Sequence, residues 1–358
     1  MSDLQISLLG IGACVVAGVY LFNWWQERQF RRRSEQAFAR EHDDVLLQGA
    51  AAQDRDPVER VEPRISVEPA RAPAAVRTAL RTPAATVVDP VIDYVVEVSM
   101  QSAVDGAGLH EQLRALAAGW GKPVLVAGYD PASGEWHDAG IGSGKQYPQL
   151  RFALQMSNRA GCVEQSQLTA FRDAALKWTE PRQGVVKCMD VAEAHAMAVQ
   201  LDRFCADVDI AIGINVVTHD GNPFSGTKIR ALAEAAGLKL EPDGVFYSYG
   251  DRGDALFTLD NHEPMPFVPE QMKTLFTGGV TFLLDVPRVG DALRAFDAML
   301  ELARNFAAAL GGVLVDDNRA ALSDGAIDKI HRQLESILAK MDAGQISAGG
   351  ARALRLFS

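Results

Sequence analysis

An uncharged stretch from Leu4 to Trp25 constrains this 358-residue chain more than any other feature of its sequence. A helix of that length, at about 1.5 Å per residue, spans roughly 33 Å, which is enough to cross a membrane once. Arginines follow the stretch at 31–33, whereas no basic residue precedes it. By the positive-inside rule we expect residues 1–3 outside, a transmembrane helix over 4–25 and the bulk of the chain inside. The alternative is a buried core helix, but core helices rarely run so long without a charge.

The composition changes after this stretch. Residues 26–90 mix arginines with acids and carry recurring prolines among alanine, valine and threonine. Such a segment buries too little apolar surface to offset its ordering entropy, so we expect a disordered cytoplasmic tether over 26–90. The alternative is a spacer without a function.

Composition also excludes several classes of function. The formal net charge of -11 argues against a broad basic surface for nucleic acid. The four cysteines show no CxxC spacing, and the seven histidines show no pair at metal-ligand spacing, so we expect reduced thiols, no metal and no cofactor.

Two local motifs invite a catalytic interpretation, and both are weak. The segment Gly140–Lys145 reads GIGSGK but lacks the first glycine and the final Ser or Thr of a phosphate-binding loop, so a loop between strands is expected. Asp316 and Asp317 are neighbours at a strand end, where adjacent side chains point to opposite faces. With no Ser-His-Asp or Cys-His signature in the sequence, we expect a protein that is not an enzyme.

A strand–helix pattern occurs twice after the tether. Tyr94–Met100 alternates like a half-buried strand and Leu109–Trp120 has helical periodicity. The pair returns as Ile210–Val217 and Lys228–Leu238, and the quartet RALA stands in both helices, 116 positions apart. Chance similarity is the alternative to an internal repeat.

The repeat predicts an α+β fold of two tandem split β-α-β units, 91–207 and 208–342, with sheets backed by helices. The first will be called the first unit and the second the second unit. A flexible tail is expected over 343–358, and a strand at 208–217 would either be shared by the two units or leave the first incomplete. Further matched pairs are Arg151–Met156 with Leu256–Asn261, a helix at Val163–Trp178 with one at Pro269–Phe276, and the strands ending at Val191 and Val286.

The second unit carries a specific resemblance. The segments HDGNPFSGTKIRALAEAAGL, ALFTLDN, PEQMKTLFTGGVTFLLDVPRVGDALRAFDAML and GGVLVDDNRAALSDGAIDKIHRQLESI, within residues 209–342, resemble the C-terminal domain of the ZipA family of bacterial division proteins. The order of anchor, tether and cytoplasmic domain resembles that family as well. The resemblance implies an FtsZ-binding adaptor at the division site of the inner membrane, single-pass with a periplasmic N-terminus. It implies no catalysis and no small-molecule substrate.

The resemblance further implies that the sheet face away from the helices accepts the C-terminal tail peptide of FtsZ. Strand alternation assigns this face independently, with Phe257, Leu259, Phe282 and Leu284 turned toward the helices. The expected peptide-binding residues are Ala211, Gly213, Val245, Tyr247, Thr258, Asp260, His262, Thr281 and Leu283.

This expected face departs from the family pattern. Family grooves are rich in Met, Phe, Ile and Val, whereas small and polar residues dominate here. At about 25 cal/mol per Å² of apolar area, losing several large side chains removes a few kcal/mol of affinity. A scaffold that binds a different division or envelope protein is therefore the alternative function. The first unit is either structural or a second docking surface.

Overall fold

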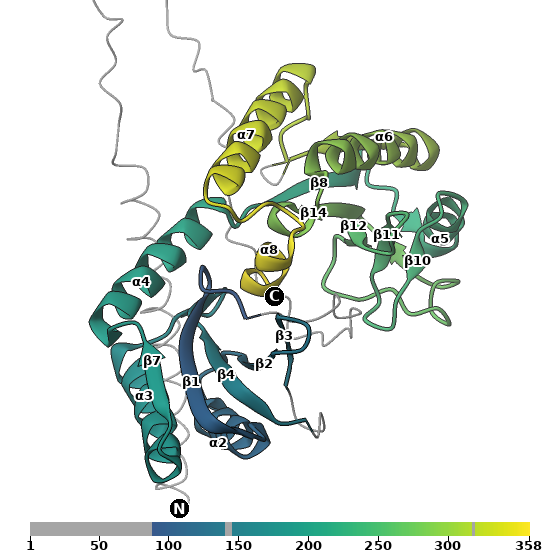
Figure 1. Ribbon diagram of the computed structural model, residues 1–358. Helices are drawn as coiled ribbons and strands as arrows, with labels where there is room; N and C mark the ends of the chain where they lie inside the picture. Colours follow the sequence, from purple (N-terminus) through teal and green to yellow (C-terminus); the bar gives the residue numbers. More distant parts are fainter. Residues whose placement is uncertain (1–87, 140–144, 317–318) are drawn as a thin grey trace, which may run out of the picture. The chain divides into compact units, whose positions relative to one another are not determined.

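The computed structural model describes residues 88–139, 145–316 and 319–358 (Figure 1). The expected transmembrane helix over 4–25, the tether up to residue 87, most of the GIGSGK loop and Asp317 lie outside the described residues. Within the described part of the chain, no helix combines the length and the apolar character needed to cross a membrane. Seven α-helices and antiparallel sheets in this described part confirm the predicted α+β class.

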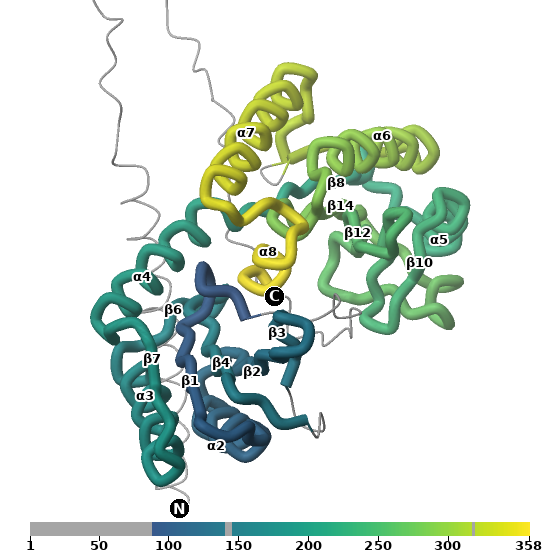
Figure 2. The backbone as a smooth tube through the Cα atoms, in the orientation of Figure 1, coloured from purple at the N-terminus to yellow at the C-terminus, as the bar shows by residue number. Residues whose placement is uncertain are grey.

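The first unit is built on a five-stranded sheet in the order β3-β2-β4-β1-β7 (Figure 2). Both β1 and β2 pair antiparallel with β4, so β1 and β2 run parallel with β4 between them, which is the split β-α-β arrangement. The elements are β1 (Asp93–Val104), α2 (Ala107–Ala117), β2 (Val124–Asp130), β3 (Glu135–Asp138), β4 (Tyr147–Gln155), a hairpin of β5 (Ser157–Asn158) and β6 (Gly161–Cys162), α3 (Gln165–Thr179), β7 (Val185–Cys188) and α4 (Val191–Val208).

The second unit is built on a six-stranded sheet in the order β10-β11-β12-β14-β8-β15. Its elements are β8 (Ala211–Thr218), β9 (Phe224–Ser225), α5 (Gly226–Ala235), β10 (Lys239–Leu240), β11 (Phe246–Tyr249), β12 (Ala255–Asn261), β13 (Phe276–Thr277), β14 (Gly279–Asp285), α6 (Ala292–Leu310), β15 (Gly312–Val315) and α7 (Asp324–Ala343). A short helix, α8 (Ala351–Leu356), follows.

Helix α6 covers one face of the second sheet. The Asp291 carboxylate accepts the backbone N–H of Arg294 at its start, and Gly311 ends it with φ 74, a left-handed conformation suited to glycine. Buried residues recur at helical spacing along it, and Phe306 meets Phe282 of β14 edge-on, with ring centroids 5.3 Å apart. The predicted inward residues Phe257, Leu259, Phe282 and Leu284 are all buried, which confirms the alternation.

Both units keep the predicted strand–helix order, but their sheets differ in strand order: β2 lies next to β4, whereas β11 is separated from β14 by β12. The strand at 208–217, which the sequence left either shared by the two units or missing from the first, is not shared. Val208 ends α4, and β8 begins at Ala211 and pairs with β14 and β15 of the second sheet. The order of elements equates β4 with β14, α3 with α6 and β7 with β15, one strand away from the predicted matches. Short apolar strands resemble one another in sequence, so similarity alone matched strands of the first unit to the wrong strands of the second.

The prediction of a helix at Pro269–Phe276 is also wrong. Residues 269–274 form turns, in which Met272 N–H donates to the Val268 carbonyl, and β13 begins at Phe276. Buried Met272 packs into the core of the second unit from this turn.

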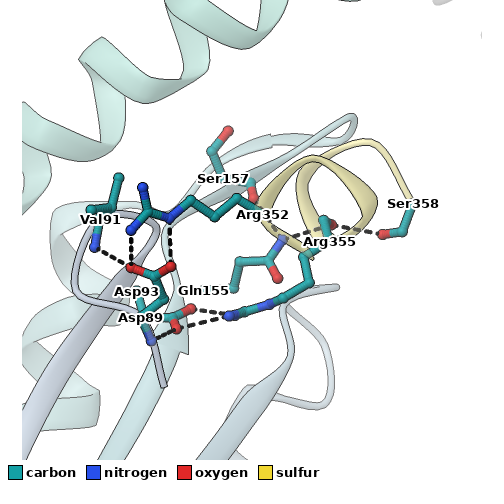
Figure 3. A network of polar contacts seen from close by, with 8 residues as sticks. All are labelled: Asp89, Val91, Asp93, Gln155, Ser157, Arg352, Arg355 and Ser358. Atoms are coloured by element: carbon teal, nitrogen blue, oxygen red, sulfur yellow. Dashed lines mark hydrogen bonds and ion pairs between the residues drawn. The ribbon is translucent and has the colours of Figure 1, made fainter. Parts of the chain in front are cut away.

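Residues 343–358, expected as a flexible tail, are folded. Ile346, Leu356 and Phe357 are buried in the core of the first unit, and α8 contributes two arginines to carboxylates at the start of β1 (Figure 3). The segment is short and rich in glycine and alanine, so local periodicity gave no sign of its burial against a strand more than two hundred residues away.

Candidate peptide-binding face

The side chains expected at the binding face come together on the side of the second sheet away from α6. The register aligns Tyr247 of β11 with Thr258 of β12, Thr258 with Leu283 of β14, and Leu283 with Gly213 of β8. Leu283 is 41% exposed, whereas its neighbours Phe282 and Leu284 are fully buried. One continuous row across four strands therefore presents an exposed aliphatic side chain near its centre.

A second row is polar and joined by hydrogen bonds. Asp260 aligns with Thr281, and Thr281 aligns with Asn215. The Thr281 hydroxyl donates to Asn215 Oδ1 at 2.7 Å, and His262 Nδ1 lies 3.2 Å from the same hydroxyl oxygen. The middle of the face is therefore fixed and hydrogen-bonding rather than apolar.

Two tyrosines of β11 form a flat strip beside Thr258. The rings of Tyr247 and Tyr249 are stacked, with centroids 6.0 Å apart and planes 19° from parallel. Tyr247 donates its hydroxyl hydrogen to Asp243 at 2.7 Å, and Tyr249 donates to Glu241 at 2.9 Å. Burial, with the Glu241 carboxylate as a second cause, raises the pKa of Tyr249 to about 12, so this hydroxyl stays protonated at neutral pH. The strip offers ring surface in a fixed position.

The remaining expected residues lie at the margins of these rows. Val245 immediately precedes β11 and His262 follows β12, while Ala211 aligns with Asp285 at the end of β14. Arg159 of the first unit closes that end, since its guanidinium ion-pairs with Asp285 at 2.8 Å. The structure thus places all nine expected residues on one side of the sheet or at its rim.

Asn215 is the residue that the sequence prediction omitted. It is buried on this face and accepts the Thr281 hydrogen bond. The signal was available, because the alternation that puts Ala211 and Gly213 on this side also puts Asn215 there. The described residues contain no group of three or more His, Cys, Asp or Glu arranged to hold a metal ion.

Asp260 makes the stability of this face depend on pH. Burial raises the pKa of its carboxyl, although the Asn261 backbone N–H donates to it at 2.7 Å. The folded protein therefore holds this proton more tightly than the unfolded chain, and its stability gains as pH falls from the raised pKa toward the ordinary value of about 4. We expect Asp260→Asn to increase the free energy of unfolding at pH 7, with the gain narrowing toward pH 4.

Urea unfolding of the full chain in detergent micelles, between pH 4.5 and 7, measures this difference. Asp251→Asn removes an equal charge from an exposed turn and is the matched control. A gain that is the same at every pH, or that Asp251→Asn reproduces, would contradict the assignment to half-buried Asp260.

Comparison with known proteins agrees with this geometry. Residues 210–333 match the family model described as ZipA, C-terminal FtsZ-binding domain. Cell division protein ZipA of Marinobacter nauticus is 31% identical over 125 residues, which cover 34% of this chain and 37% of that protein. The aligned part thus spans well under half the length of this relative. The family match includes all six strands of the second sheet and all nine expected face residues. The second unit is therefore similar in sequence to the C-terminal domain of the ZipA family.

Proposed function

We propose that the second unit binds the C-terminal tail peptide of FtsZ across the face formed by β11, β12, β14 and β8. The observation that carries this proposal is the exposed Leu283 in the row Tyr247–Thr258–Leu283–Gly213, on a sheet whose other face is filled by α6. An apolar side chain in a solvent-facing row between a tyrosine strip and a small residue suits an extended or helical peptide laid across the sheet. The family description supports the same partner.

The chain would act as a membrane-anchored adaptor of cell division rather than as an enzyme. Leu4–Trp25 would anchor it in the inner membrane, with residues 1–3 in the periplasm, and residues 26–87 would tether the folded body on the cytoplasmic side. The polar row Asp260–Thr281–Asn215 lowers the apolar area available to one peptide. Weak contacts repeated along a filament still give firm attachment, because each further contact is intramolecular.

Substitution of Leu283 tests the proposed face. We expect Leu283→Glu to weaken binding of an FtsZ tail peptide at least about tenfold, because it places a charge where an apolar contact forms. Leu176→Glu is the matched control: Leu176 is 44% exposed, close to the 41% of Leu283, and lies on α3 of the first unit. Isothermal titration of each full-length variant with the peptide gives both affinities. Equal affinities for the two variants would contradict binding at this face.

A different division or envelope protein is the second candidate partner. The hydrogen-bonded set Asn215, Thr281 and His262 favours it, because these groups match a peptide with polar side chains better than a wholly apolar one. Absence of binding to millimolar FtsZ peptide, together with absence of co-sedimentation with FtsZ polymer, would reject FtsZ and leave this candidate.

A further inference from the structure

The corresponding face of the first unit is apolar and partly covered by the chain itself. The register aligns Val95 of β1 with Ala153 of β4, and Ala153 with Leu125 of β2. Val88, the first described residue, is buried with Ala127 and Ala153, and Val95, Leu125 and Trp136 pack around them. This cluster is separate from the main core of the first unit, so it lies on the sheet side away from α2 and α3.

The two units differ at this equivalent position. In the second unit the face carries the polar row Asp260–Thr281–Asn215 and an exposed Leu283. In the first unit the face carries aliphatic and aromatic side chains, which Val88 contacts, and next to them the ion pair of Arg151 with Glu97 at 2.9 Å. The first unit therefore has an apolar docking surface, which the second unit largely lacks. Val88 of the same chain already contacts this surface.

The direction of the chain at Val88 is set by the residue that follows it. Asp89 lies four residues before β1, where its backbone N–H donates to Asp93 at 2.8 Å and its carboxylate pairs with Arg352 of α8 (Figure 3). Asp93 aligns with Gln155, two residues along β4 from Ala153. Asp89 therefore lies beside the Asp93–Gln155 pair, and Val88, the residue before it, lies beside Ala153. Traced toward the N-terminus, the chain moves across the sheet in the direction of Trp136.

The far end of this path is an aromatic pair. Tyr129 and Trp136 have ring centroids 5.4 Å apart, and the Arg151 guanidinium lies 3.9 Å over the Trp136 ring. Tyr129 stands two residues beyond Ala127 on β2, a distance of about 7 Å. Residues 84–87, Ala-Ala-Thr-Val, reach about 13 Å when extended, so they are long enough to cross from Val88 to this pair. Their small and β-branched side chains match a shallow apolar face.

We propose that residues 84–88 are the resident peptide of the first unit's open face. The chain itself then fills the docking surface of the first unit, and each chain offers one open face, that of the second unit, to a partner. The free part of the tether begins before residue 84, on the Trp136 side of the sheet. This self-docking does not depend on FtsZ binding, and its test needs no FtsZ.

Thiol labelling in the full chain tests the proposal. Leu125→Cys places a thiol under the proposed peptide, and Leu283→Cys places one on the open face of the second unit. Replacing residues 84–87 by Gly-Ser-Gly-Ser is expected to speed maleimide labelling at Cys introduced at 125 at least about fivefold, the change produced by losing a contact of modest strength. Labelling at 283 stays constant. Peptide mass spectrometry separates these sites from the native cysteines.

Two further measurements decide between occupants. A benzophenone side chain at position 125 is expected to cross-link to residues 84–87 of the same chain, as shown by mixing light and heavy isotopic forms. An unchanged labelling rate, cross-links that join two chains, or cross-links that avoid residues 84–87 would each overturn the proposal. If Leu125→Cys fails to fold, as shown by a lost urea transition, Tyr129→Cys gives the same readout from the same face of β2, at the far end of the proposed path.

Discussion

Arg355→Ala is expected to lower the free energy of unfolding of the first unit by about 3–5 kcal/mol, the cost of leaving a buried charge without its partner. The Asp93 side chain is fully buried and that of Arg355 is 14% exposed, and they form two hydrogen bonds, one of them Arg355 Nη1 to Asp93 Oδ2 at 3.0 Å. Gln155 adds a bond to the Arg355 carbonyl at 3.1 Å. Loss of the guanidinium would leave the Asp93 carboxylate buried without its ion-pair partner, and α8 would lose its contact with the start of β1.

Urea unfolding of the full chain, with hydrogen exchange at residues 351–358, measures both effects. Arg352→Ala is the matched control, because its ion pair with Asp89 is more exposed and is expected to cost about 1 kcal/mol or less. The double variant Asp93→Asn/Arg355→Gln removes both charges, keeps the acceptor for the Asp89 N–H and should recover much of the loss. A loss for Arg355→Ala no larger than for Arg352→Ala would contradict a buried ion pair.

Phe282→Ala is the second change with a large expected effect, about 3–5 kcal/mol of the second unit's stability. Phe282 is fully buried against Phe306, so its removal leaves a cavity between β14 and α6. Leu283, the next residue, points to the other face and is 41% exposed. Leu283→Ala should cost well under about 1 kcal/mol of stability while weakening the peptide, because the side chain contacts few residues of its own chain.

Comparing Phe282→Ala with Leu283→Ala separates an effect on stability from an effect on peptide binding at two adjacent residues. Urea midpoints of the two full-length variants give the stabilities, and peptide titration below each transition gives the affinities. A similar stability loss for both variants would show that the two faces of β14 are equally packed, which would remove the basis for a docking face there.

Strand faces could be read from the sequence because their cause is local. Successive side chains of a strand point to opposite sides, so the order Thr281, Phe282, Leu283, Leu284 itself assigns in and out. The same rule extends to Asn215, which was missed only because residues were carried over from a family pattern. The strand partners were harder, since β12 and β14 are both short and apolar and either fits the pattern predicted for the other.

The sequence by itself determined the α+β class, the strand–helix order of the two units and the side of the sheet on which the expected face residues lie, because periodicity and order act over a few residues. Only the tertiary structure decided that residues 343–358 are folded, that Asp93 pairs with Arg355 and that Val88 rests on Ala153. The Asp93–Arg355 contact joins positions 262 residues apart. Burial of a charge depends on what the rest of the chain brings to it, and no local pattern of charges or apolar residues specifies that partner.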